Sequence, residues 1–151
     1  MVKPKLTSQA KGPPYVGALL RLALQRVRRQ MDADVRAAGF TDLQPAHAPI
    51  LSYPPPDGVR LSQLARRVGM TPQATNYLVS QLEEMGYLER RAAGATTRRL
   101  IFLTKRGHRL VETFHASLRA LEATWAREVG QERFDTFMDV LRQLEAKPAA
   151  R

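Results

Sequence analysis

The apolar positions between residues 61 and 104 predict two short helices followed by a β-hairpin. Leu61, Leu64 and Val68 recur at helical spacing, so the first helix carries one apolar stripe. Gly69 stands where the end of a helix favours a residue at positive φ, which predicts a tight turn. This order of elements is that of a helix-turn-helix with a hairpin beside it.

The second helix has a capping signal at its start and a glycine at its end. Thr71 can cap it through its hydroxyl, and Pro72 suits the first helical position, where no backbone donor is missed. The helix is predicted to run to about Met85, with Gly86 as its stop. Residues at helical spacing form its buried stripe: Thr75, Leu78, Val79, Leu82 and Met85. Polar residues at the same spacing share one exposed face: Gln73, Asn76, Tyr77 and Ser80.

Two short runs with alternating apolar residues predict the hairpin. Tyr87–Arg91 and Arg99–Leu103 are expected to be its strands, joined by a loop over Ala92–Arg98 with Gly94 as the turn residue. The second strand carries apolar side chains on both faces, so one face must pack against the helices. The basic end of the loop can enter a minor groove or bind phosphates, and the hairpin is therefore interpreted as a wing.

Longer apolar stripes on either side of this segment predict further helices. They cover Tyr15 to about Ala38, Gln44–Tyr53, Lys105 to about Arg127, and the residues after Gly130. The predicted fold class is mainly α with a small β-hairpin wing: a winged helix-turn-helix with N- and C-terminal dimerisation helices. Its parts are a flexible tail over 1–14, N-terminal helices for dimerisation and support over 15–53, the winged helix-turn-helix over 54–104, and C-terminal dimerisation helices over 105–147.

These terminal helices carry more apolar surface than a monomer of this size is expected to cover. Packed onto the same helices of a second copy, they would bury it in a two-fold homodimer. The alternative is that they pack on the chain's own helix-turn-helix. A two-fold axis would also present two reading helices to successive major grooves, about 34 Å apart on a pseudo-palindromic site. We therefore favour the homodimer.

Positive charge is concentrated in the segment that holds the helix-turn-helix. From Arg60 to Arg109 there are ten Lys or Arg residues against three Glu, and this net +7 is most of the chain's formal +10. Such clustering is typical of a phosphate-binding surface, and amide, phenol and hydroxyl groups suit base edges and phosphates. The alternative is an ordinary solvated helix face. The predicted DNA-binding residues are Ser62, Gln63, Arg66, Arg67, Thr71, Gln73, Ala74, Asn76, Tyr77, Ser80, Arg98 and Arg99.

The pattern favours a sequence-specific transcriptional regulator over two other classes of protein. A sequence-independent architectural DNA-binding protein is the main alternative, since a net charge of +10 alone would bind any duplex. An enzyme is not expected, because no glycine-rich phosphate loop or serine-centred elbow occurs. His108, Glu112 and His115 are helix neighbours, but two ligands make a weak site, so we expect neither a metal nor a cofactor.

Composition favours a single cytoplasmic domain. The chain has 151 residues, of which 44% are hydrophobic, and this is enough for one core. No run approaches the roughly 18 apolar residues that a membrane span needs, and no apolar secretory segment stands near the start. Because the chain has no cysteine, disulfides and thiol-based redox sensing are excluded.

Three short runs in the predicted DNA-binding module form a recognisable set. They are Leu61-Ser62-Gln63-Leu64-Ala65, Leu82-Glu83-x-x-Gly86-Tyr87-Leu88-x-Arg90 and Leu103-Thr104-x-x-Gly107. With these runs the chain resembles the MarR (multiple antibiotic resistance regulator) family of winged-helix transcription factors. The length and the flanking helices extend the resemblance to nearly the whole chain. It implies a homodimeric, DNA-binding regulator, and we expect a repressor.

The predicted wing departs from a pattern common in that family, in which an Asp-x-Arg stands near the wing tip. Counting back from Leu103-Thr104 places Ala95-Thr96-Thr97 there. A shift by one residue gives Thr96-x-Arg98, in which a hydroxyl replaces the carboxylate. The wing arginine is therefore either Arg98 or Arg99, held less firmly than in the common pattern.

Family members often bind small aromatic or lipophilic anions between the dimer helices and the DNA-binding module. The resemblance therefore implies a small-molecule effector that controls DNA binding. Tyr15, Arg21, His47 and Tyr53 lie in segments that can line such a crevice, and they are the predicted ligand-binding residues. The alternative is that the two tyrosines and His47 are ordinary groups at the edge of the core.

Overall fold

The computed structural model describes residues 12–94 and 98–146. Within these residues it contains helices and one antiparallel hairpin, which confirms the prediction of a mainly α winged-helix fold. The elements in chain order are α1 (Val16–Ala37), α2 (His47–Leu51), α3 (Leu61–Val68), α4 (Pro72–Glu84), β1 (Leu88–Ala92), β2 (Arg99–Leu103), α5 (Lys105–Val129) and α6 (Gln131–Ala146). Residues 1–11 of the predicted tail, 95–97 of the predicted wing tip and 147 of the last predicted part lie outside the described residues.

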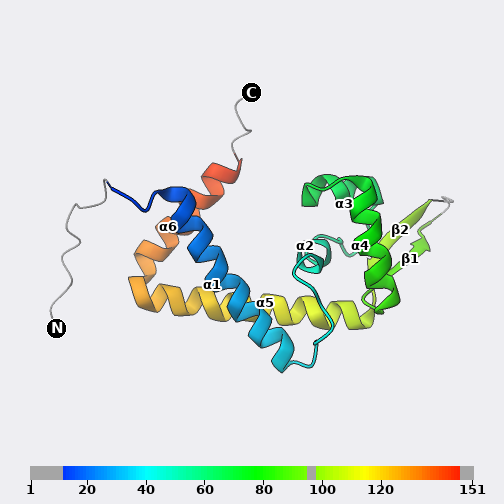
Figure 1. The fold of residues 1–151 in the computed structure, drawn as a ribbon, viewed down its shortest axis with the longest axis horizontal. Helices are drawn as coiled ribbons and strands as arrows, with labels where there is room; N and C mark the ends of the chain where they lie inside the picture. The colour runs from blue at the N-terminus through cyan, green and yellow to red at the C-terminus, as the bar shows by residue number, and fades with distance from the viewer. Residues whose placement is uncertain (1–11, 95–97, 147–151) are drawn as a thin grey trace.

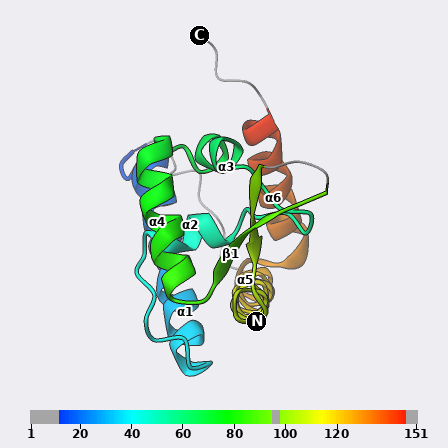
Figure 2. The same cartoon turned by 90° about the vertical axis from the view of Figure 1, so that its right-hand side faces the viewer.

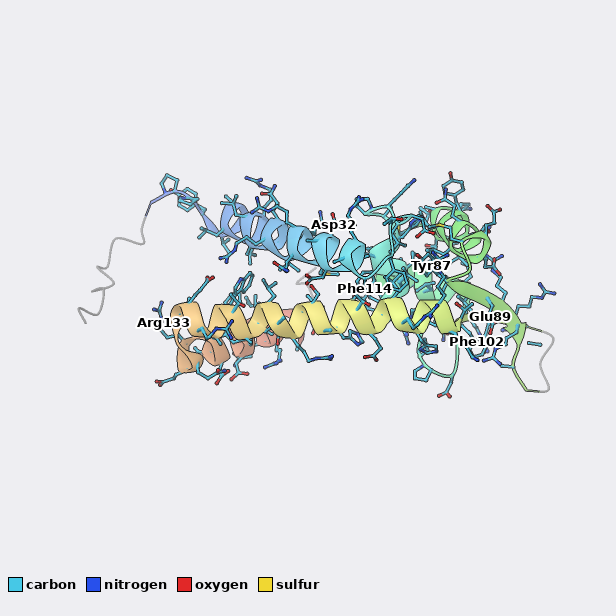
Figure 3. All side chains as sticks on the ribbon, turned by 90° about the horizontal axis from the view of Figure 1, so that it is seen from below. Asp32, Tyr87, Glu89, Phe102, Phe114 and Arg133 are labelled. Carbon is cyan, nitrogen blue, oxygen red and sulfur yellow. The ribbon has the colours of Figure 1, made fainter. Side chains whose placement is uncertain are left out.

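The elements form two parts that are joined by the long helix α5 (Figure 1). Helices α3 and α4 and the β1–β2 hairpin gather at the start of α5. Helix α1 runs along α5, and α6 folds back beside its end (Figures 1 and 3). The 25 residues of α5 therefore connect the helix-turn-helix directly to the terminal helices.

The main core lies inside the part that holds the helix-turn-helix. Side chains from α3, α4, β2 and α5 meet there with almost no exposed surface: Leu64, Val79, Leu82, Ile101 and Leu110. In α1, by contrast, only Val35 is buried. Large apolar side chains of α1 and α6 stay exposed: Val16, Leu19, Leu20, Leu22, Leu24, Phe137, Val140 and Leu144. A single chain thus leaves the apolar faces of its terminal helices uncovered.

Strand β2 is covered on both faces, whereas the sequence pattern predicted only that one of its faces packs against the helices. Ile101 packs into the core and pairs with Val59 in an isolated bridge. Phe102 on the other face is also buried, because Arg91 stacks over its ring, 3.9 Å from the centroid. The loop at Gly58 lies against the same ring. The base of the hairpin is therefore held from both sides.

The α2 segment is shorter than predicted. The pattern indicated a helix over 44–53, but the structure has one over His47–Leu51. Gln44 precedes Pro45 and Tyr53 precedes Pro54, and a residue before proline is disfavoured in helical conformation because of a steric clash with the proline ring. Gln44 and Tyr53 lie outside the helix, as this rule favours, although Ala48 is helical directly before Pro49.

Two hydrogen bonds and a close backbone contact fix the start of α5 against the end of α4. The Thr104 hydroxyl accepts a hydrogen bond from the Gly107 amide (3.0 Å) and donates one to the Gly86 carbonyl (2.6 Å). A Cβ on Gly107 would lie 2.1 Å from the Tyr87 carbonyl oxygen, so only glycine fits there. This packing explains the Leu-Thr-x-x-Gly motif, and it ties α5 to the end of α4.

A cluster of polar groups joins the α1–α2 connection to the same junction. The Tyr87 hydroxyl donates to Asp42, and the Arg106 guanidinium donates to Asp42 (3.0 Å) while lying 4.2 Å over the Tyr87 ring. Burial and the hydrogen bond to Asp42 raise the pKa of Tyr87 to about 12, which keeps it a donor. Burial would raise the pKa of Asp42, but the contacts with Tyr87 and Arg106 outweigh it and lower that pKa.

Acid is expected to weaken this cluster. The pKa of Asp42 is lower in the folded protein, so its contribution to stability is complete above the ordinary value of 3.8 and is lost as the pH falls through the folded value. Asp42→Asn should therefore reduce the drop in unfolding free energy between about pH 5 and about pH 3, by up to about 1 kcal/mol for so exposed a pair. Urea denaturation at both pH values measures it. Asp57→Asn, in an exposed loop, is the control, and an equal change in both variants would contradict the assignment.

Candidate nucleic-acid interface

The turn between α3 and α4 has the geometry that its sequence predicted. Gly69 adopts a left-handed conformation (φ 70°), which lets the chain leave α3 sharply. The Thr71 hydroxyl accepts a hydrogen bond from the Ala74 amide (3.2 Å), and Pro72 occupies the first turn of α4. Both of these predicted DNA-binding residues, Thr71 and Ala74, thus form the capped start of α4.

One face of α4 presents polar side chains to solvent. Gln73, Asn76 and Tyr77 are exposed, with Tyr77 at 64%, and Ser80 is half-buried further along the helix. The buried stripe on the other side consists of Thr75, Leu78, Val79 and Leu82. Figure 2 shows α4 at the edge of the molecule, beside the hairpin. The structure therefore places these four predicted DNA-binding residues on one face of α4 that is accessible to solvent.

Asn76 is held by Arg90, an arginine outside the predicted set of DNA-binding residues. Arg90 of β1 donates a hydrogen bond to the Asn76 carboxamide oxygen (2.8 Å) and lies 3.4 Å from a Glu83 carboxylate oxygen. The amide oxygen of Asn76 therefore accepts one hydrogen bond from within the protein, which fixes the orientation of the carboxamide. Its second lone pair and its NH₂ group remain as an acceptor and a donor.

The predicted residues of α3 divide into two groups. Ser62 and Arg66 are exposed on the surface of the helix. Gln63 accepts a hydrogen bond from the Arg60 backbone amide (3.3 Å) and so caps the start of α3. Arg67 donates to the Tyr53 carbonyl (3.3 Å), which ties α3 to the preceding segment. The first pair is free to meet phosphates, whereas the second pair supports the helix.

The hairpin projects beside α4 and carries exposed arginines (Figure 2). Its strands pair from Leu88 with Leu103 to Ala92 with Arg99. Strand β1 begins one residue later than predicted, because the Tyr87 amide donates to the Leu82 carbonyl (2.8 Å) and so completes the end of α4. Arg98 and Arg99, the predicted wing arginines, are both exposed. The predicted tip residues 95–97 lie outside the described part of the chain.

A cavity of about 460 Å³ lies between α1, α2 and α5. Its walls are largely apolar, with Met31 of α1 and Phe114 of α5 among them, and the charged groups on its rim are Arg28 and Asp32. Asp32 of α1 and Phe114 of α5, both labelled in Figure 3, are among the residues that line it. Of the four predicted ligand-binding residues, this cavity includes Tyr53.

The structure does not bring the other three predicted ligand residues to this cavity. Tyr15 is 68% exposed at the start of α1, and Arg21 is exposed one turn and a half further along. His47 is only 2% exposed, and both of its ring nitrogens have hydrogen-bond partners, the Gln44 amide and the Gln81 side chain. A histidine in this arrangement is a structural group of the core.

Residues 12–94 and 98–146 contain no group of three or more histidine or acidic side chains that could hold a metal ion. None of their helices combines the length and the apolar composition that crossing a bilayer requires.

An exposed polar helix after a tight turn, with a basic hairpin at its side, defines a winged helix-turn-helix protein. The model of the MarR family matches residues 41–99. The HTH-type transcriptional repressor Rv2887 of Mycobacterium tuberculosis is 32% identical over 109 residues, which are 72% of this chain and 77% of the relative. The chain belongs to the MarR family and is a transcriptional regulator.

Solved structures agree with this assignment. The structure of Rv2887 in complex with salicylic acid is 29% identical, with a TM-score of 0.62, and the match covers 89% of this chain and 98% of that one. CouR from Rhodococcus jostii, bound to p-coumaroyl-CoA, is 21% identical and shares the fold, with a TM-score of 0.67 over 91% of this chain and 96% of that one.

Proposed function

We propose that the protein is a cytoplasmic, sequence-specific repressor that binds a pseudo-palindromic operator as a homodimer and responds to a small aromatic anion. The observation that carries the proposal is the exposed face of α4, where Asn76 is oriented by Arg90 beside a basic hairpin. An oriented donor on a capped helix can discriminate base edges, whereas net charge alone cannot. Enrichment of bound fragments from random duplex DNA tests this function.

The homodimer is supported by the uncovered faces of α1 and α6. Leu19 of α1 and Leu144 of α6 are 52% and 64% exposed, although both belong to apolar stripes. Exposed apolar area of this kind gains about 25 cal/mol per Å² when a second copy covers it. Because α5 joins these helices to the helix-turn-helix, a dimer formed through them would fix the spacing of its two reading helices.

Six exposed residues of the interface have proposed roles in DNA binding. Asn76 and Gln73 meet base edges in the major groove, and Ser62 and Arg66 of α3 meet the phosphates beside it. Arg98 and Arg99 contact the backbone or the adjacent minor groove through the wing.

Removing the charges of Arg98 and Arg99 is expected to flatten the salt dependence of DNA binding. Each lost phosphate contact should reduce the slope of log affinity against log salt concentration by about one unit. Arg98→Gln combined with Arg99→Gln makes the change without altering the hairpin registers, since both side chains are exposed. Fluorescence anisotropy over a series of salt concentrations measures the slope.

The matched control combines Arg119→Gln and Arg142→Gln, which removes the same charge from exposed positions of α5 and α6. The control should keep the wild-type slope. If the wing variant also keeps it, the hairpin does not contact the phosphates.

The cavity between α1, α2 and α5 is the proposed effector site. Its size and apolar walls suit one aromatic ring, and Arg28 on its rim can pair with a carboxylate. The salicylic acid complex of Rv2887, a relative in the same family, supports this class of ligand. An anion here would contact α1, α2 and α5 together, and so would bias how the DNA-binding module sits on the terminal helices.

Arg28→Gln is expected to weaken binding of a small aromatic carboxylate about tenfold or more, because a charge-assisted hydrogen bond is lost. Titration calorimetry with salicylate as the probe measures the affinity. The neighbouring Arg29→Gln is the control, since Arg29 is exposed and does not line this cavity. Equal affinities in both variants would place the carboxylate elsewhere.

A further inference from the structure

A chain of three hydrogen bonds runs from the connection before α2 to the reading face of α4. The Gln44 backbone amide donates to His47 Nδ1 (3.1 Å). His47 Nε2 lies 3.0 Å from Gln81 Oε1, and Gln81 Nε2 lies 3.0 Å from the Tyr77 hydroxyl oxygen. The chain thus links a buried ring, 2% exposed, to a phenol that is 64% exposed.

Chemistry fixes the direction of every bond in this chain. A backbone amide can only donate, so His47 Nδ1 must be the acceptor, and the ring proton lies on Nε2. Nε2 then donates to the Gln81 oxygen, which turns the Gln81 NH₂ group toward Tyr77. Because the Tyr77 oxygen accepts this bond, its own proton has to point away from Gln81.

We propose that His47 and Gln81 are positioning residues that make Tyr77 an outward hydrogen-bond donor to DNA. The acceptor is an oxygen or nitrogen with a free lone pair, either a phosphate oxygen or an acceptor on a base edge. The proposal rests on the proposed function in one respect, namely that the exposed face of α4 meets DNA. The proposal gives the Tyr77 hydroxyl proton a defined direction. Exposure alone would leave that hydroxyl free to rotate.

The orientation matters because a phenol that is not held in place contributes less binding free energy to the complex with DNA. A long surface side chain that must be ordered on binding costs rotamer entropy, and a partner that holds it beforehand removes part of that cost. Gln81 is half-buried on α4 and is itself fixed by the buried His47. The same pattern occurs at Asn76, whose oxygen is fixed by Arg90.

A double-mutant cycle between Tyr77→Phe and Gln81→Met tests the proposal. Methionine has a similar length and a good helix propensity but offers no hydrogen bond to Tyr77. In the protein that keeps Tyr77, Gln81→Met is expected to weaken DNA binding roughly 3- to 10-fold, the range of one hydrogen bond. In the Tyr77→Phe background the same substitution should have almost no effect. Equal losses in both backgrounds would overturn the proposal.

A second variant, Gln81→Glu, reverses the direction of the hydrogen bond with Tyr77 instead of removing it. A carboxylate only accepts, so it keeps the bond from His47 but draws the Tyr77 proton inward. DNA affinity should fall more with Tyr77 present than in the Tyr77→Phe background, which reports the effect of the added charge alone. A spectroscopic readout is the tyrosine Fermi doublet in ultraviolet resonance Raman spectra, taken as a difference against Tyr77→Phe. The doublet should change from that of a phenol that both accepts and donates to that of a phenol that donates to the carboxylate, and an unchanged doublet would contradict the assigned direction.

Binding to two duplexes of equal length, the preferred operator and a random sequence, distinguishes a base acceptor from a phosphate acceptor. A loss of affinity for the preferred operator alone assigns the Tyr77 contact to a base. An equal loss of affinity for the random duplex assigns it to a phosphate. If selection with the wild-type protein yields no preferred operator, the proposed function fails, but the cycle on random duplex still decides the role of Gln81. Urea denaturation of each variant accompanies the binding measurements, so that a loss of folding is not counted as a loss of contact.

Discussion

Replacing Leu19 and Leu144 with glutamate is expected to produce a folded monomer and to lower affinity for a two-half-site operator by about 100-fold or more. Both side chains are exposed in the single chain, so the substitutions leave its own core intact. In a dimer they would place four unpaired charges in an apolar interface. Loss of the second reading helix makes the second half-site contact intermolecular again, which removes an avidity gain of about 10² to 10⁴.

Analytical ultracentrifugation at low concentration and operator titration measure the two effects on the same samples. The matched control combines Gln25→Glu and Gln143→Glu, which adds the same charge to exposed polar positions of α1 and α6. The control should remain dimeric and bind normally. A monomeric variant with full operator affinity would contradict the proposed architecture.

Asn76→Ala is expected to weaken binding to the preferred operator by about 1–3 kcal/mol and to relax the preference at one base pair of each half-site. The outward NH₂ group of Asn76 is lost, while the phosphate contacts of α3 and the wing are unaffected. Affinity for random duplex should therefore change little. Competition binding with operators altered one base pair at a time measures both quantities.

A variant of Arg90 tests the same prediction independently. Because Arg90 holds the Asn76 oxygen, Arg90→Leu should relax the same base pair, and it should add little in the Asn76→Ala background. An equal loss on specific and random DNA in the Asn76 variant would show that Asn76 contacts the backbone and reads no base.

Local signals in the sequence predicted the elements of the helix-turn-helix because their causes are local. Gly69 in a left-handed turn and Thr71 as a cap act on neighbouring residues, so spacing alone reveals them. Strand β2 was placed at its observed bounds for the same reason, since apolar alternation marks it. The ends of the α2 helix were misplaced, because apolar spacing alone does not mark the residues at which a helix begins and ends.

The positioning contacts were beyond the sequence because they join residues that are distant along the chain. Arg90 reaches Asn76 across 14 positions, and Gln81 reaches His47 across 34. Each looks like an ordinary polar residue until the hairpin and α2 are packed against α4. His47 was placed at a ligand crevice on the basis of its segment, but its burial and its two partners are consequences of tertiary packing. An available signal was the helical spacing of Tyr77 and Gln81, which puts them on one face.

The most direct test of the central claim is selection of bound fragments from a pool of random duplex DNA with the wild-type protein at physiological salt. A dimer with one reading helix per half-site should enrich an inverted repeat whose half-site centres lie about 10 base pairs apart. Enriched fragments should compete far better than random duplex. A pool with no common sequence after repeated rounds would contradict sequence-specific repression, and would instead identify the protein as a sequence-independent DNA-binding protein.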